Sequence, residues 1–112
     1  MPKNKDGVWE PEGGIESYKE LPRSLQYGVQ AYIELGQIPG DFLCAVIENN
    51  LVGAIRRADS GNQVALPKIV GWIYNEAPSQ CWGSHDKLVD WVKERELDIP
   101  AVREKAKERL PR

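Results

Sequence analysis

The chain has 112 residues, of which 41% are apolar and 29% charged, and its formal net charge is −2. This length suits one domain with a modest hydrophobic core. No apolar run reaches the roughly 20 residues that a membrane-spanning helix needs, and the first residues lack the apolar stretch of a signal peptide. We therefore expect a cytoplasmic protein that has no membrane partner.

The basic residues, 15 in number, are interleaved with 17 acidic ones. General nucleic-acid binding relies on a basic patch, so this mixing argues against it. The two cysteines are too few for a disulfide scaffold and fit a reducing compartment.

Residues 1–20 scatter glycines and prolines among charges, a pattern typical of an irregular N-terminal arm. We expect Trp9, Ile15 and Tyr18 to anchor this arm. Residues 21–112 then form a single helical domain. Its first helix is predicted over 22–35, where apolar residues recur at helical spacing after Pro22, and Gly36 ends it.

The stretch FLCAVIENNLVGAIRRAD, residues 42–59, predicts a central helix over 41–58. At about 100° per residue, one broad apolar face gathers Leu43, Val46, Ile47, Leu51, Ala54, Ile55 and Ala58. The opposite face holds Phe42, Ala45, Asn49, Gly53 and Arg56, with one charge among them. A helix with two such faces is usually buried on both, either within a bundle or against another subunit. In the second case the protein is a homo-oligomer.

Three further helices are predicted, over 63–76, 85–96 and 100–110. Pro67 lies either in the first turn of the 63–76 helix or at a kink, and Pro78 ends that helix. Ser84 is a typical N-cap for the 85–96 helix. No convincing alternation of apolar and polar residues predicts a strand. We therefore expect an all-α fold, a compact bundle of four to five short helices with an irregular N-terminal arm.

Catalytic chemistry finds little support. The single histidine, His85, follows Cys81 by four residues, but the intervening Trp82 and Gly83 argue against a thiol–imidazole pair and favour a surface histidine. Cys44, Cys81 and His85 are three ligands where a structural zinc site needs four. No phosphate-binding loop is present. We predict no catalytic residue, no metal and no cofactor.

A binding site is the favoured interpretation, with candidate residues Asn49, Asn50, Gly53, Arg56, Arg57, Asp59, Trp72 and Trp82. Five of them have structural alternatives that remain open: an interhelical hydrogen bond for the amides, close helix packing for the glycine, and the helix dipole for the two arginines. Arginine, aromatic and amide groups together suit a nucleotide pocket or a protein hot spot equally well.

The segments YIELGQIPGDFL, NNL, RAD and WGS, within about Leu21 to Val92, resemble small uncharacterised proteins encoded by phages and prophages. The resemblance implies a small accessory phage protein and carries no activity. We therefore expect a non-enzymatic phage protein that inhibits a host or defence factor. It would act by docking on a host or defence protein, or by sequestering a nucleotide second messenger.

Two alternatives remain open. The first is a small enzyme or enzyme subunit that uses Asn49, Arg56, Asp59 and Glu76 in one polar pocket, which requires these side chains to converge with perturbed carboxylate pKa values. The second is a DNA-associated accessory factor that uses Lys87, Lys93, Arg95, Arg103, Lys105, Lys107 and Arg109. This hypothesis predicts steeply salt-dependent binding, whereas interleaved acids predict none.

Overall fold

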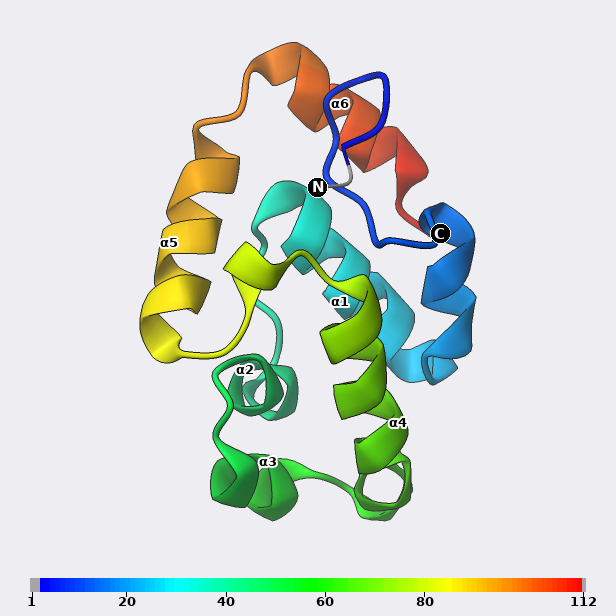
Figure 1. The fold of residues 1–112 in the computed structure, drawn as a ribbon, viewed down its shortest axis with the longest axis vertical. Coiled ribbons are helices and arrows are strands. Elements are labelled where there is room, and N and C mark those ends of the chain that lie inside the picture. The colour runs from blue at the N-terminus through cyan, green and yellow to red at the C-terminus, as the bar shows by residue number, and fades with distance from the viewer. Residues whose placement is uncertain (1–2, 112) are drawn as a thin grey trace.

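A computed structural model describes residues 3–111 (Figure 1). Apart from one isolated bridge between Lys3 and Trp9, the regular structure of these residues is helical. The six α-helices are α1 (Arg23–Leu35), α2 (Asp41–Ile47), α3 (Leu51–Arg57), α4 (Ser60–Glu76), α5 (His85–Glu96) and α6 (Pro100–Arg109), and two short 3-10 helices are η1 (Ile15–Glu20) and η2 (Ser79–Cys81). The predicted all-α class is confirmed. The described residues contain more helices than the four to five predicted, because the central helix is two helices.

The prediction of one helix over 41–58 is wrong, because the chain turns between α2 and α3. Asn49 has a φ of 64°, in the left-handed region that asparagine adopts more readily than most residues. The N–H of Asn50 donates to the Ala45 carbonyl at 2.8 Å and closes α2. The Asn50 side chain then accepts from the N–H of Gly53 at 3.0 Å and begins α3. One asparagine pair therefore ends a helix and starts the next.

This turn also overturns the two predicted faces. Phe42 and Ala45, assigned to a second face that needs a partner, are 8% and 4% exposed and belong to the main core. Leu51 and Ile55, assigned to the core face, are 62% and 46% exposed. Because α3 runs in a new direction, helical positions counted from α2 no longer predict which side of α3 is covered.

The main core lies where α1 meets α2, α4 and α5. Tyr32 and Trp91 are almost fully buried in it. The Trp91 indole N–H donates to the Tyr32 carbonyl at 3.1 Å, and the Tyr32 hydroxyl donates to the Cys81 carbonyl at 2.6 Å. These bonds satisfy the polar tips of two large side chains inside an apolar core, as buried polar groups require. They fix α1, η2 and α5 relative to one another.

The N-terminal arm packs against the helices instead of standing apart from them. Val8 forms a second small core with Leu35 and Ala106. The Trp9 ring meets the Trp91 ring edge-on, with centroids 5.1 Å apart. Of the predicted anchors, Trp9 and Tyr18 pack against the main core, whereas Ile15 is 38% exposed and was wrongly predicted as an anchor.

A buried polar network joins the arm, α1 and α6. The carboxylate of Glu34 accepts a hydrogen bond from the Tyr18 hydroxyl at 2.8 Å and another from Arg109 Nε at 2.8 Å. Arg109 also pairs with Glu10 at 2.9 Å. Burial raises the pKa of the Glu34 carboxyl, and its bonds to Arg109 and Tyr18 act in the opposite direction. These contacts tie the arm and the C-terminal end of α6 to α1.

The helix α4 begins at Ser60, three residues before the predicted start, because the Asp59 side chain accepts from the N–H of Asn62 at 2.7 Å. Pro67 lies inside this helix. The boundaries of α1, α5 and α6 fall within one residue of the predicted ranges. Among the described residues, no helix has the length and apolar character needed to cross a membrane.

Candidate functional site

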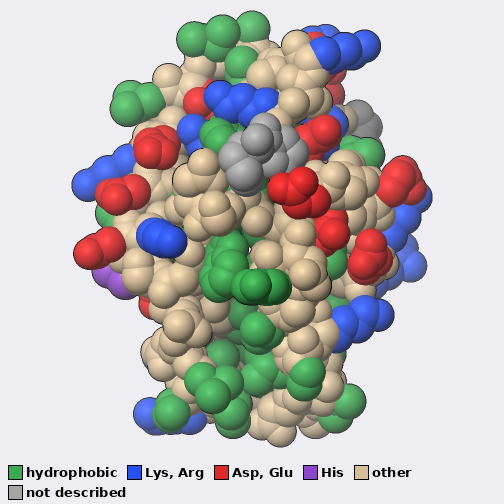
Figure 2. Space-filling view, in the orientation of Figure 1, with side chains coloured by type: hydrophobic (Ala, Val, Ile, Leu, Met, Phe, Trp, Pro, Cys, Tyr) green, Lys and Arg blue, Asp and Glu red, His purple; other side chains and the backbone are tan. Residues whose placement is uncertain are grey.

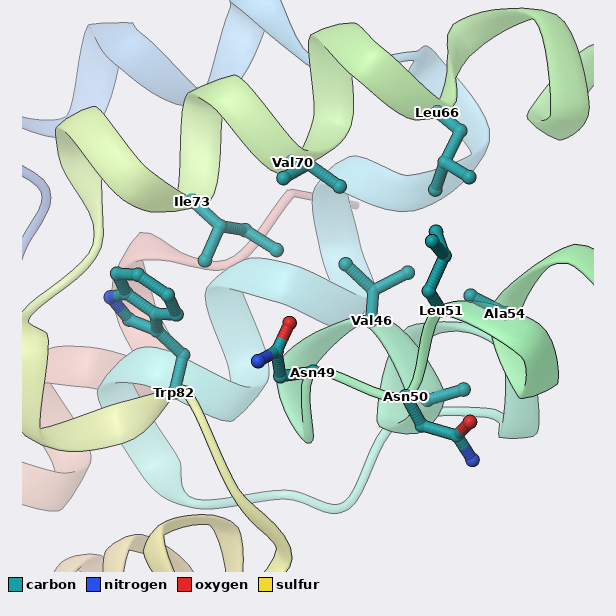
Figure 3. Close-up of a pocket in the computed structure, with 10 residues that line it drawn as sticks. Val46, Asn49, Asn50, Leu51, Ala54, Leu66, Val70, Ile73 and Trp82 are labelled. Carbon is teal, nitrogen blue, oxygen red and sulfur yellow. The ribbon is translucent and has the colours of Figure 1, made fainter.

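A partly open groove of about 140 Å³ separates the α2–α3 pair from α4 (Figure 3). One side is formed by Ala45, Val46, Asn49, Asn50, Leu51 and Ala54, and the other by Leu66, Val70 and Ile73, with Trp82 at one end. None of these ten residues is charged. The groove is therefore an apolar recess whose lining includes two asparagines.

The groove exists because α3 is short and turned away from α2. Ala54 is buried and holds α3 against the core, and the buried backbone of Gly53 lets the capping side chain of Asn50 lie close to the helix. On the facing helix, Leu66 and Ile73 are buried while Val70 between them is 46% exposed. The floor of the groove is thus core, and its rim is open to solvent.

Exposed apolar side chains continue beyond the rim. Six exposed residues of α3 and α4 make up what we call the apolar patch: Leu51, Val52, Ile55, Val64, Val70 and Tyr74. Figure 2 shows hydrophobic side chains gathered over the lower part of the molecule, where α3 and α4 lie, while charged side chains crowd the upper part. Exposed apolar side chains that gather on one part of a small protein are typical of an interaction surface.

The two asparagines have different roles at the groove. The Asn50 carboxamide points away from it and caps α3. The Asn49 carboxamide points into the groove, toward the side where Ile73 and Trp82 lie (Figure 3), and it makes no hydrogen bond to any described residue. Its donor and acceptor are therefore available to a ligand. A left-handed non-glycine residue is also a backbone feature that concentrates at binding and active sites.

Trp82 closes one end of the groove and is held there by its loop. Its ring meets the exposed ring of Tyr74 edge-on, with centroids 6.0 Å apart. The next residue, Gly83, donates its N–H to the Ile47 carbonyl at 2.7 Å, which ties this loop to the end of α2. The groove therefore has a fixed aromatic wall at this end.

An ion pair reinforces the same junction. His85, the first residue of α5, lies with Nδ1 2.6 Å from Glu48 Oε2 at the end of α2. The hydrogen bond and the charge of Glu48 raise the pKa of the exposed His85 ring. His85 therefore ties the start of α5 to the carboxylate of Glu48, the residue that follows α2.

The nearby Cys81 thiol is buried, and burial raises its pKa to about 12, which is unfavourable for a nucleophile.

The remaining predicted site residues lie outside the groove. The Trp72 indole is buried and donates to the Ser17 carbonyl at 2.8 Å, so it is a core residue. Asp59 caps α4, and Gly53 is buried beneath the Asn50 amide. Arg56 is exposed on α3. Of the eight predicted residues, the structure brings Asn49, Asn50 and Trp82 together.

Arg57 lines a separate polar hollow. It donates to the Gly53 carbonyl at 3.3 Å and shares this hollow, of about 190 Å³, with Asp41, Cys44, Ala45, Glu48 and Asn50. Two carboxylates in so small a space oppose the binding of another anion. The hollow therefore does not resemble a phosphate site.

The polar pocket of the enzyme hypothesis is not formed. Asp59 precedes the first turn of α4, whereas Glu76 is its last residue and accepts from the N–H of Gly13 at 2.8 Å. At 1.5 Å per residue, the two positions are roughly 25 Å apart along the helix. The carboxylates of this hypothesis therefore serve opposite ends of one helix.

Sequence reasoning missed the apolar side of the groove, above all Leu51, Val70 and Ile73. A usable signal was present in residues 60–75, where Lys68 is the one charged residue and apolar residues occur all round the helix. Such a helix is either fully buried or has an uncovered apolar side. In this structure α4 has an uncovered apolar side.

The comparisons with known proteins return no match, whether with protein-family models, curated proteins or solved structures.

Proposed function

We propose that this protein is a non-enzymatic binding protein whose groove between α2–α3 and α4 receives apolar side chains of a partner protein. The observation that carries the proposal is an uncharged groove that opens directly onto the apolar patch. Burying one Leu- or Val-sized side chain in such a recess contributes about 1.5–3 kcal/mol. The patch supplies several such contacts around it.

Docking on a protein is better supported than capture of a nucleotide. A nucleotide pocket needs cationic or backbone N–H groups for the phosphates, and the groove lining contains no cation. The nearby hollow that holds Arg57 also holds Asp41 and Glu48. A ligand that extends over the apolar patch gains more from this surface than a charged small molecule.

The DNA-associated alternative has weak support. Several of the basic residues proposed for it pair with acidic ones: Lys107 lies 3.3 Å from Glu104, and Lys105 lies 4.0 Å from Glu108. Arg95 bonds Asp98 at 2.8 Å. Paired charges of this kind release few counterions on DNA binding.

The resemblance to phage-encoded proteins suggests the class of target. On that basis we propose that the partner is a host or defence protein and that docking inhibits it by covering a surface it needs. Inhibition of this kind requires no catalytic group, only an interface that excludes water around a few apolar anchors.

The test compares capture from host-cell lysate by the wild-type protein with capture by Leu51→Glu and Val70→Glu. Both residues are exposed at the groove, so a carboxylate there disrupts docking without entering the core. The matched control is Leu97→Glu, because Leu97 is 83% exposed and lies at the end of α5, outside the groove.

We expect a stoichiometric host protein to bind the wild type and Leu97→Glu, and at least a tenfold loss for the two groove variants at unchanged melting temperature. Equal capture by all four proteins contradicts docking at the groove. A nucleotide extracted from the purified protein in stoichiometric amount favours sequestration instead.

A further inference from the structure

Residues 3–10 of the N-terminal arm, which we call the strap, lie against α1, α5 and α6 (Figure 1). We infer that the strap opens as a unit while the helices stay folded, and that its opening uncovers Trp91 and Arg95 of α5 and Ala106 of α6. This conformational device goes beyond the proposed function, because it lies away from the groove and needs no occupant there.

The backbone of the strap is hydrogen-bonded to itself. The N–H of Asn4 donates to the Val8 carbonyl at 2.9 Å, and the N–H of Gly7 donates to the Asn4 carbonyl at 3.0 Å. Asn4 Oδ1 also accepts from the N–H groups of Asp6 and Val8. Within the described part of the chain, no backbone group of the strap bonds a helix. The strap can therefore leave the helices without breaking a backbone hydrogen bond, which is typical of segments that open locally.

Two apolar side chains attach the strap to the helices. Val8 is buried against Leu35 and Ala106 in the second, small core. The partly buried ring of Trp9 meets Trp91 edge-on. Neither side chain belongs to the buried set of the main core. Their departure therefore exposes apolar surface at this end of the molecule and leaves the packing between α1, α2 and α4 in place.

The third attachment is an ion pair near the surface. Glu10 lies 2.9 Å from Arg109, and the two side chains are 21% and 19% exposed. Arg109 also bonds the buried carboxylate of Glu34. When Glu10 leaves, that inner bond still holds the end of α6 to α1. The strap thus has a latch whose release does not take the network apart.

The contact between the strap and α5 leaves two donors without acceptors. The guanidinium carbon of Arg95 lies 4.2 Å from the centre of the Trp91 ring and 5.4 Å from that of Trp9. Arg95 Nη1 and Trp9 Nε1 are buried, and neither bonds an acceptor in the described residues. A buried donor without a partner is unfavourable, and opening returns both donors to water. Arg95 keeps its bond to Asp98 in the open state, because that bond does not involve the strap.

A clamp on α4 marks where the strap ends. The N–H of Glu12 donates to the Glu76 carbonyl at 2.9 Å, and the N–H of Gly13 donates to Glu76 Oε1 at 2.8 Å. The Trp72 indole then holds the Ser17 carbonyl at 2.8 Å. These bonds fix the arm from residue 12 onward, so the inferred motion is confined to the residues before it.

The first experiment measures hydrogen exchange of the indole N–H groups by NMR in the full-length wild-type protein, at several urea concentrations below the unfolding transition. The Trp9 proton reports the strap. The Trp72 proton reports the docking of the arm beyond the clamp, and the Trp91 proton, which bonds the Tyr32 carbonyl, reports the body.

We expect the Trp9 proton to exchange at least about a hundredfold faster than the other two, with a urea slope between zero and that of global unfolding, because the slope scales with the surface exposed. Equal rates and slopes for Trp9 and Trp91 overturn the inference, since the strap then opens only with the whole fold. A Trp72 proton as fast as that of Trp9 overturns the boundary at the clamp. A slope of zero for Trp9 overturns opening as a unit.

The second experiment measures thiol labelling of Ala106→Cys in a Cys44→Ser background. Ala106 is fully buried beneath Val8, and the buried Cys81 of the same chain is the internal reference. The labelling is repeated with Glu10→Gln, which weakens the latch. The matched control is Glu16→Gln, because Glu16 pairs with Lys19 on the exposed surface beyond the clamp.

The thiol at position 106 should react at least about a hundredfold faster than Cys81. Glu10→Gln should accelerate its labelling at least twofold and leave Cys81 unchanged, and Glu16→Gln should change neither thiol. Equal reaction of the two thiols overturns the inference. Acceleration of both thiols by Glu10→Gln indicates global destabilisation, and acceleration of neither indicates that Ala106 is reached through α6. Either result overturns the strap, and none of these outcomes bears on the groove.

Discussion

Asn49 and Asn50 have different roles in the turn between α2 and α3. Asn50 uses its side chain to begin α3, with Oδ1 3.0 Å from the N–H of Gly53. Asn49 takes the left-handed backbone conformation that redirects the chain, which leaves its carboxamide at the groove. The position of this amide at the groove is therefore a consequence of the turn.

Substitution of Asn49 separates its two contributions. Asn49→Ala should lower the free energy of unfolding by about 1 kcal/mol, because the left-handed conformation is unfavourable for alanine. Asn49→Gly should stay within about 0.5 kcal/mol of the wild type, since glycine adopts that conformation freely. Both variants remove the carboxamide and should weaken capture of the partner from host-cell lysate to a similar degree. Urea denaturation and lysate capture measure the two effects, and unchanged capture by both variants argues against a role for the amide.

Replacing each of two helical glycines by alanine should change the stability of the protein in opposite directions. A Cβ at Gly53 would lie 2.5 Å from Asn50 Nδ2 and 2.8 Å from Arg57 Nη1. Gly53→Ala should therefore displace the cap and destabilise the protein by about 1 kcal/mol. At Gly71, in α4, no atom outside the neighbouring helix backbone and the two adjacent residues lies within 4 Å of the added methyl, so Gly71→Ala should gain up to about 1 kcal/mol from helix propensity. Thermal unfolding of the pair is the measurement, and a gain in both disproves the crowding at Gly53.

Glu34 should be among the most sensitive polar residues. Its side chain is fully buried and holds Tyr18 and Arg109 together. Glu34→Ala should cost about 3 kcal/mol, because the buried Tyr18 hydroxyl loses its acceptor and the partly buried Arg109 guanidinium keeps Glu10 but loses its buried carboxylate partner. The control is Glu16→Ala, which breaks an exposed pair with Lys19 and should cost less than about 0.5 kcal/mol. Similar urea midpoints for the two variants would contradict the network.

At the level of elements, local signals predicted α1, α5 and α6 because each has a recognisable start or stop. Gly36 takes a φ of 71° at the end of α1, and the Ser84 hydroxyl caps α5. The break between α2 and α3 had an ambiguous signal, since an asparagine pair fits a buried interhelical amide as well as a turn. The pattern of α4 marks a helix that is apolar all round, but it does not predict which side stays uncovered, because the exposure of Val70 and Tyr74 depends on where α3 lies.

The junction of α2 and α5 should depend on pH. The pKa of His85 is raised by its bond to Glu48, so the protonated ring favours the folded state. The stabilising contribution is complete below the ordinary histidine pKa of about 6.5 and is lost as pH rises through the higher folded-state value. Since His85 is the single histidine, its ring signals in an NMR titration give that pKa directly. The value should fall in Glu48→Gln, and an identical value in both proteins refutes the pair.

At the scale of the whole molecule, the two ends differ in how well other segments of the chain cover them. The upper end in Figure 1 is closed by the arm and α6, which share a small core and the Glu34 network. The lower end, built by α2, α3 and α4, has an open groove and few charges. The fold class followed from sequence pattern, but this contrast arises from contacts between segments far apart in the chain. Three of the predicted site residues reached the groove because they lie at turns.

The central claim, that this groove binds an apolar side chain, can be tested before any partner is identified. N-acetyl-phenylalanine amide is titrated into the methyl-labelled protein, and the methyl resonances are followed by NMR. We predict saturable shifts at the methyls of Val46, Val70 and Ile73, small shifts at the exposed methyls of Leu97, and loss of the response in Val70→Glu. The absence of shifts up to the solubility limit, or equal shifts at Leu97, would contradict the claim.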